Sequence, residues 1–304
     1  VNTLTKEQRK EVPTTPTVDY VRGTGGLASE TVVFCVDTSV SMEAKIRGSS
    51  ISRLDAVKEA LRSNLQSMHE AGGKQKVCIV EFESEVRLHG DCTSDPVEVE
   101  YRLKWDYDGM VAFAEKCASP QPLSSTYDHV LDRVNGLVIR GSTALGPALL
   151  LATVIAGREG QGKVILCTDG EANEGIGRNS SDTSFYRQVG ELANRTGVVI
   201  DINTTEGCDS DVRVIGEASA VTGGTVTIVK PGEVTDAFRS NLDQTVVALD
   251  AELTFRTHPA VRITDLSGSQ QFSGATHHVK TVRNDTVFMF RYGLANTEQP
   301  PDFG

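Results

Sequence analysis

Three short polar segments hold carboxylate and hydroxyl side chains next to apolar runs. They are residues 37–41 (DTSVS), 141–146 (GSTALG) and 167–171 (CTDGE). Carboxylate and hydroxyl oxygens are the ligands that hard cations such as Mg²⁺ prefer. The alternation in the first segment lets one loop direct several oxygens to one point. The residue types therefore predict a divalent-cation site on Asp37, Ser39, Ser41, Thr143 and Asp169.

These side chains can form one site only if the strands and loops that carry them lie next to each other in the fold. The apolar runs 31–36 and 163–168 are typical of buried strands, and they lead directly into the first and third segments. In an open parallel sheet, ligands bind beyond the carboxyl ends of the strands. Asp37 and Asp169 stand side by side there if their strands are neighbours. Taken one at a time, each segment is equally consistent with capping of the following helix.

The rest of the chain alternates between strand and helix patterns, which predicts an α/β fold. We expect a doubly wound, mainly parallel sheet flanked by helices. The predicted strands are 31–36, 76–82, 163–168, 197–203 and 225–229, with a hairpin partner at 85–89. The predicted helices are 52–70, 125–135, 144–157, 184–195, 211–222 and 232–247.

We expect three regions along the chain. Residues 1–30 form an N-terminal extension and linker with a short strand at 18–22, and residues 31–248 form the main domain with an insertion at about 91–124. Residues 249–304 alternate without a helical period, notably at 252–257, 261–263 and 287–292, which predicts an antiparallel β extension from a small β-sandwich. The first residue is not Met and the end is Pro-Pro-Asp-Phe-Gly, so we expect a piece of a longer protein.

Composition narrows the class of partner. The net charge of -11 and the pI near 5.1 disfavour nucleic acid, which needs a basic surface. No apolar run is long enough to span a membrane. The six cysteines show no C-x-x-C pair, and Cys35, Cys78 and Cys167 lie inside predicted core strands, which favours a reducing cytoplasm. Four N-x-[ST] triplets stand against that localisation.

The five predicted ligands match a known pattern in order and context. Asp37-x-Ser39-x-Ser41, Thr143 and Asp169 resemble the metal-ion-dependent adhesion site of von Willebrand factor A domains, over roughly residues 30–248. The resemblance implies ligation through the three hydroxyls, with the two carboxylates binding directly or through water. It implies Mg²⁺, or else Mn²⁺ or Ca²⁺, as the cofactor. It further implies a protein partner that completes the coordination shell with a carboxylate.

A narrower resemblance concerns residues 167–177, which are similar to the A-domain portion of circularly permuted Ras proteins. It implies a GTPase domain outside this chain. Within the chain there is no G-x-x-x-x-G-K-[ST] motif, and residues 160–163 (GQGK) lack its first half and precede a strand. The β-rich tail also resembles the trunk and β-sandwich arrangement of the inner coat subunits of ER-derived transport vesicles.

We interpret the chain as a non-enzymatic, metal-dependent protein-binding module of a larger intracellular signalling or scaffold protein. A metal-dependent hydrolase would need a general base, but no histidine adjoins a ligand segment and no G-x-S-x-G elbow is present. A coat-like scaffold with an incidental metal stays open. In the insertion, Tyr101, Trp105 and Tyr107 either anchor a partner or bury a local flap. The sequence does not predict an oligomeric state.

Overall fold

The computed structural model describes ten stretches of the chain: residues 31–46, 48–160, 162–170, 172–178, 183–205, 209–229, 246–254, 261–264, 276–283 and 291–294. The chain divides into two compact units. One is Leu27–Thr245, and the other combines Val1–Gly26 with Val246–Gly304. The predicted strand 18–22 lies outside the described residues.

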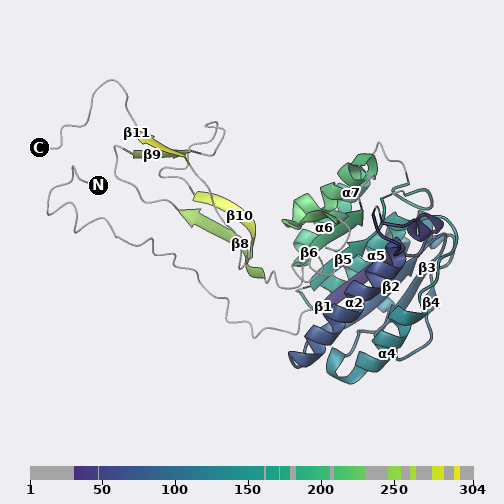
Figure 1. Ribbon diagram of the computed structural model, residues 1–304. Coiled ribbons are helices and arrows are strands. Elements are labelled where there is room, and N and C mark those ends of the chain that lie inside the picture. The colour runs from purple at the N-terminus through teal and green to yellow at the C-terminus, as the bar shows by residue number, and fades with distance from the viewer. Residues whose placement is uncertain are drawn as a thin grey trace, which may run out of the picture. The chain divides into compact units, whose positions relative to one another are not determined.

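The larger unit is built on a seven-stranded sheet in the order β4-β3-β2-β1-β5-β6-β7. Strands β2, β1, β5, β6 and β7 pair in parallel, and β3 and β4 add an antiparallel edge beyond β2 (Figure 1). The predicted doubly wound, mainly parallel sheet is confirmed, including its hairpin. The strands are β1 Thr31–Asp37, β2 Lys76–Phe82, β3 Val86–Gly90, β4 Val97–Glu98, β5 Gly162–Cys167, β6 Val198–Thr205 and β7 Val226–Val229.

Helices cover both faces of this sheet (Figure 1). The described helices are η1 Val40–Glu43, α2 Arg53–Glu70, η2 Leu103–Trp105, α3 Tyr107–Lys116, α4 Leu123–Gly136, α5 Leu145–Gly157, α6 Ser184–Arg195 and α7 Asp209–Thr222. Residues of α2 and α4 belong to one core cluster, and residues of α3, α5, α6 and α7 belong to the other. The predicted helices 52–70, 125–135, 144–157, 184–195 and 211–222 are confirmed. Helix α3, inside the insertion, was not predicted.

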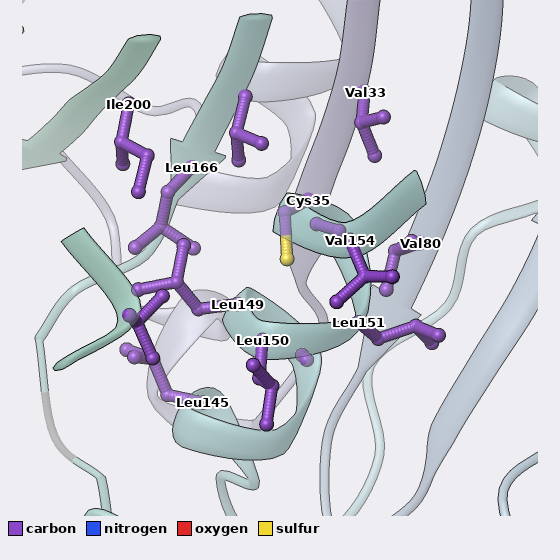
Figure 2. Packing of buried hydrophobic residues seen from close by; sticks show 14 of the residues in the cluster. Val33, Cys35, Val80, Leu145, Leu149, Leu150, Leu151, Val154, Leu166 and Ile200 are labelled. Carbon is purple, nitrogen blue, oxygen red and sulfur yellow. The ribbon is translucent and has the colours of Figure 1, made fainter. Parts of the chain in front are cut away.

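Strand β1 separates the two core clusters. Val33 and Cys35 face one cluster, while Val32, Phe34 and Val36 face the other. This burial on both faces explains the unbroken apolar run, which is typical of a central parallel strand. Helix α5 packs against β1 with all of its residues buried, and Figure 2 shows its leucines among the strand side chains. A helix that is apolar on every side belongs in a core.

The smaller unit contains two antiparallel strand pairs among its described residues. β8 (Val246–Thr254) pairs with β10 (Thr276–Arg283), and β9 (Val261–Thr264) pairs with β11 (Arg291–Leu294). The antiparallel character predicted for the tail is confirmed, although β10 was not foreseen. Residues 284–290, where the predicted strand 287–292 begins, lie outside the described part of the chain.

One predicted helix requires a correction. Residues 232–245 of the predicted helix 232–247 lie outside the described residues, and its last two residues begin strand β8. The run VVALDAELT opens on two β-branched residues and alternates apolar and polar residues from Leu249 onward, so strand pairing with β10 takes precedence over a helical continuation. Across the described stretches, no helix has the length and apolar character required to cross a membrane.

Candidate metal centre

Strand β1 ends at the first predicted ligand. Asp37 is fully buried and Ser39 is 1% exposed. Asp37 Oδ1 accepts a hydrogen bond from the Ser39 backbone N–H at 2.8 Å, and Asp37 Oδ2 accepts one from Thr168 Oγ1 at 2.7 Å. Since Thr168 directly follows β5, this second bond ties the carboxyl ends of β1 and β5 together. The structure therefore confirms that these two strands are neighbours.

The two serines of the first loop face each other. Ser39 Oγ and Ser41 Oγ lie 3.0 Å apart, at hydrogen-bond distance. Ser39 is buried, whereas Ser41 lies in η1 and is exposed. Two hydroxyl oxygens this close together are available to one ion, with the exposed one on the solvent side.

The second segment runs alongside the first and third segments. The Val40 N–H donates to Gly141 O at 3.2 Å, which places residues 140–143 next to the first loop. The backbone of Thr143 then binds the segment after Asp169: its N–H donates to Asn173 Oδ1 at 2.8 Å, and its carbonyl accepts from the Asn173 N–H at 3.1 Å. Thr143 itself is 2% exposed. All three polar segments therefore meet at one edge of the sheet, as predicted.

Asp169 has two carboxylate oxygens in different environments. Oδ2 accepts a hydrogen bond from Arg53 Nη1 at 2.7 Å, forming an ion pair in which the Asp169 side chain is 3% exposed. Oδ1 is buried and has no hydrogen-bond partner. Arg53 Nη1 also donates to Ser41 O at 3.3 Å, so this arginine joins the first and third segments.

Three residues that hold the site together were not identified from sequence. Arg53 begins α2, where a positive charge is unfavourable for the helix dipole, and its contact with Asp169 crosses 116 positions. A basic residue at the start of a helix is unusual, and this position could have suggested that Arg53 pairs with a carboxylate elsewhere in the fold. Thr168 lies within the third segment and Asn173 lies two residues after it, but no spacing rule marks them as supports.

The electrostatics of the site favour a cation. Burial raises the pKa of Asp37 to about 7, even though the Ser39 and Thr168 hydrogen bonds lower it, and the negative charge of Asp169 raises it further. A divalent cation between the two carboxylates would offset both burial and repulsion. The unpartnered Asp169 Oδ1 and the paired serine hydroxyls are oxygen donors of the kind that such an ion prefers. The residues present therefore fit a hard divalent cation.

The donor set also limits which ions fit. Among the described residues, no group of three or more His, Cys, Asp and Glu side chains is placed to hold a metal. The predicted set contains only two carboxylates, so hydroxyls, water and a partner must supply the other ligands. Two of the described histidines have contacts elsewhere, since His69 stacks on Tyr127 and His89 bonds Glu81.

The comparisons with known proteins agree with this fold. Residues 32–104 match the family model of the von Willebrand factor type A domain. Among solved structures, human COPII-coat protein Sec24c matches with a TM-score of 0.60 at 15% identity, over 86% of this chain and 40% of that one. A von Willebrand factor type A protein from Catenulispora acidiphila matches with a TM-score of 0.54 at 15% identity, over 87% of this chain and 57% of that one. At these identities the likeness concerns the fold alone.

One curated protein is similar over nearly the whole chain. Circularly permutated Ras protein 1 of Dictyostelium discoideum is 26% identical over 335 residues, which cover 97% of this chain and 40% of that protein. The chain therefore spans less than half of the length of this relative.

Proposed function

We propose that this chain, whose larger unit has the von Willebrand factor type A fold, is a protein-binding module that works through a divalent cation. Asp37, Ser39, Ser41, Thr143 and Asp169 would hold the ion, with Mg²⁺ the first expectation and Mn²⁺ or Ca²⁺ as substitutes. The observation that carries the proposal is the buried Asp169 Oδ1 without a hydrogen-bond partner, next to a second buried carboxylate. The ion would retain one coordination position for an acidic side chain of the partner.

The insertion supplies a surface next to this edge. The Ile176 N–H donates to Lys104 O at 2.9 Å, and Arg178 lies over the Trp105 ring at 4.9 Å from its centroid. The loop that carries Trp105 therefore borders the segment that follows Asp169. Tyr101 is 61% exposed and Trp105 is 37% exposed, as expected of aromatic anchors for a protein partner.

The position of Lys104 explains how this loop is held. Its side chain is 1% exposed, and its Nζ donates to Ser84 O at 2.7 Å and to Glu85 Oε2 at 2.8 Å. Ser84 Oγ in turn accepts the Ser142 N–H at 2.8 Å. The β2–β3 turn thus fixes both the aromatic loop and the segment that carries Thr143. This supports a preorganised surface around the ion.

A scaffold role is the second candidate, and the Arg53–Asp169 ion pair favours it. In that case the arginine supplies the positive charge and the metal is incidental. A hydrolase has less support, because none of the bonds recorded for the described histidines reaches the five predicted ligands. We further propose that the chain is part of a longer signalling or scaffold protein of the cytoplasm. A GTPase domain would lie elsewhere in that protein.

The test is capture of a partner by the immobilised chain in Mg²⁺ buffer, followed by elution with EDTA. We expect the wild type to release its partner on chelation, and the Asp37→Ala variant not to capture it. Replacement of one acidic residue of the identified partner by its amide should abolish binding. A partner that remains bound in EDTA to both chains would refute the metal-mediated contact and favour the scaffold. Ser124→Ala, an exposed serine on α4, is the matched control.

A further inference from the structure

A cavity of about 400 Å³ lies between the β2–β3 hairpin and α4. None of the five predicted metal ligands lines it. Its walls carry an unusual share of cationic and imidazole side chains: Arg87, His89, His129, Arg133 and Arg140. Its volume is within the usual range for small-molecule sites. The cavity is thus a second site, separate from the metal centre.

The walls of the cavity carry three guanidinium groups and two carboxylates. Among the described residues, Arg133 and Arg140 form no ion pair with a carboxylate, whereas Arg87 pairs with Glu83 at 2.8 Å and with Glu98 at 3.3 Å. The wall carboxylate of Glu81 is bonded to His89 at 2.8 Å, and Asp132 is exposed to solvent. In a chain with a net charge of -11, an excess of guanidinium groups around one cavity is a local exception.

One buried donor at this cavity lacks a hydrogen-bond partner. Arg87 Nη1 is buried and unpartnered. His89 is 6% exposed, and its Nε2 is bonded to the Glu81 carboxylate. Buried polar atoms normally find a partner, because leaving one unpaired costs about 1–3 kcal/mol. A ligand that accepts hydrogen bonds would satisfy Arg87 Nη1.

The neighbouring thiol, that of Cys92, adds no negative charge that would repel an anion in the cavity. Cys92 lines the same cavity, and burial raises its pKa to about 12 even though the charge and hydrogen bond of Arg133 lower it, so the thiol remains neutral at physiological pH. A hydrogen bond holds the backbone at Arg140 in place, because its N–H donates to Thr38 O at 2.7 Å. The guanidinium group therefore extends from a fixed backbone position.

We propose that this cavity binds a small phosphate monoester, with Arg133 and Arg140 as the main charged contacts and with Arg87 as a buried donor. Guanidinium groups bind phosphate oxygens in a bidentate manner, and a phosphate accepts hydrogen bonds on three oxygens. A phosphate can therefore accept hydrogen bonds from several of these donors at once, whereas a carboxylate has only two oxygens to accept them.

The experiment is calorimetric titration of the whole chain with inorganic phosphate and with O-phosphoserine, both in EDTA so that the metal centre does not contribute. We expect saturable binding of one phosphate per chain. Arg133→Ala and Arg140→Ala should each weaken it about tenfold or more, as loss of a charge-assisted hydrogen bond does. Both side chains are at least partly exposed, so the variants should keep the wild-type melting temperature.

Arg213→Ala is the matched control, because this exposed arginine lies on α7, away from the cavity. It should leave the affinity for phosphate unchanged. Absence of saturable binding overturns the proposal, as does an equal loss of affinity in all three variants. Tighter binding of acetate than of phosphate overturns the assignment of the ligand. None of these outcomes bears on the metal centre, which is tested separately.

Discussion

Arg53 and a divalent cation would compete for the same carboxylate. The guanidinium reaches Asp169 Oδ2 at 2.7 Å and Ser41 O at 3.3 Å, so it places a positive charge at the mouth of the predicted metal site. A cation that binds both Asp37 and Asp169 must share Asp169 with this arginine or displace it. We therefore expect Arg53 to stabilise the metal-free chain and to weaken its affinity for metal.

This competition predicts the effect of Arg53→Ala. Without the arginine, the buried Asp169 carboxylate loses its charge-assisted hydrogen bond, so the metal-free chain should lose about 1–3 kcal/mol of unfolding free energy. The affinity for Mg²⁺ should rise, because a competing cation is gone. Urea unfolding in EDTA and calorimetry with Mg²⁺ measure the two effects. Arg62→Ala, an exposed arginine of the same helix, is the control. If both variants behaved alike, the competition would be disproved.

A second residue-scale prediction concerns acid stability. Burial alone would raise the pKa of Glu83, but the hydrogen bonds from Arg87 and Ser84 hold it below its ordinary value of 4.5. A carboxyl with a lowered pKa in the folded chain stabilises it above the unfolded pKa, and this stability is lost as the pH falls through the folded pKa. Glu83→Gln should therefore reduce stability at pH 7 and flatten its decline below pH 5, as measured by urea unfolding.

The control for this series is Glu100→Gln, which changes an exposed carboxyl of the insertion. It should leave the pH profile of the wild type unchanged. A Glu83→Gln profile that runs parallel to the wild type through the acid range would contradict the assigned role of the Glu83–Arg87 pair.

At this scale the sequence predicted where the two aspartates lie but not which residues hold them in place. Asp37 and Asp169 could be predicted because each directly follows an apolar strand, and strand ends in a parallel sheet share an edge. Arg53 could not be predicted, since its partner is fixed only once α2 packs against the sheet. The same is true of the Thr168 bond to Asp37, which depends on the register of β1 against β5.

At the scale of elements, α5 connects the core to the metal centre. It begins two residues after Thr143 and is buried throughout. Near its start, Gly146 allows a very close approach of the segment after Asp169: a Cβ at Gly146 would lie 1.9 Å from Ile176 O. The helix and the residues that follow the third polar segment are therefore in contact through a position that only glycine fits.

Gly146→Ala is accordingly expected to destabilise the chain by about 1–3 kcal/mol, despite the higher helix propensity of alanine, because the segment at Ile176 must move. Gly136→Ala is the control, since a Cβ at the end of α4 meets nothing within 4 Å. It should be neutral or slightly stabilising. Chemical denaturation compares the two. Equal effects of both substitutions would refute the close packing at α5.

The elements themselves were predictable where periodicity is strong. The apolar face of α2 and the unbroken run of β1 identify both from sequence. Helix α3 was missed because it lies in an insertion rich in aromatic and acidic residues, although Met110 and Ala114 bury it against the core. The end of the predicted helix 232–247 was wrong because Val246 pairs in a sheet whose second strand, β10, has no apolar pattern.

At the scale of the whole molecule, the five predicted ligands lie in the larger unit, and the chain carries 41 acidic residues against 30 basic ones. An acidic surface attracts divalent cations weakly and without specificity. Binding of a metal by the chain is therefore not sufficient evidence by itself. The central claim is that one ion binds at the junction of the three polar segments.

The most direct test is calorimetric titration of the whole chain with Mn²⁺ or Mg²⁺, alongside Asp37→Ala, Thr143→Ala and the control Asp132→Ala, which removes an exposed carboxyl of α4. We predict one ion per wild-type chain, loss of that ion in the first two variants and its retention in the control. Saturation should also stabilise the wild type, by about 2.7 kcal/mol at a hundredfold excess over Kd. Equal binding by all four chains, or no stoichiometric binding by the wild type, would contradict the account.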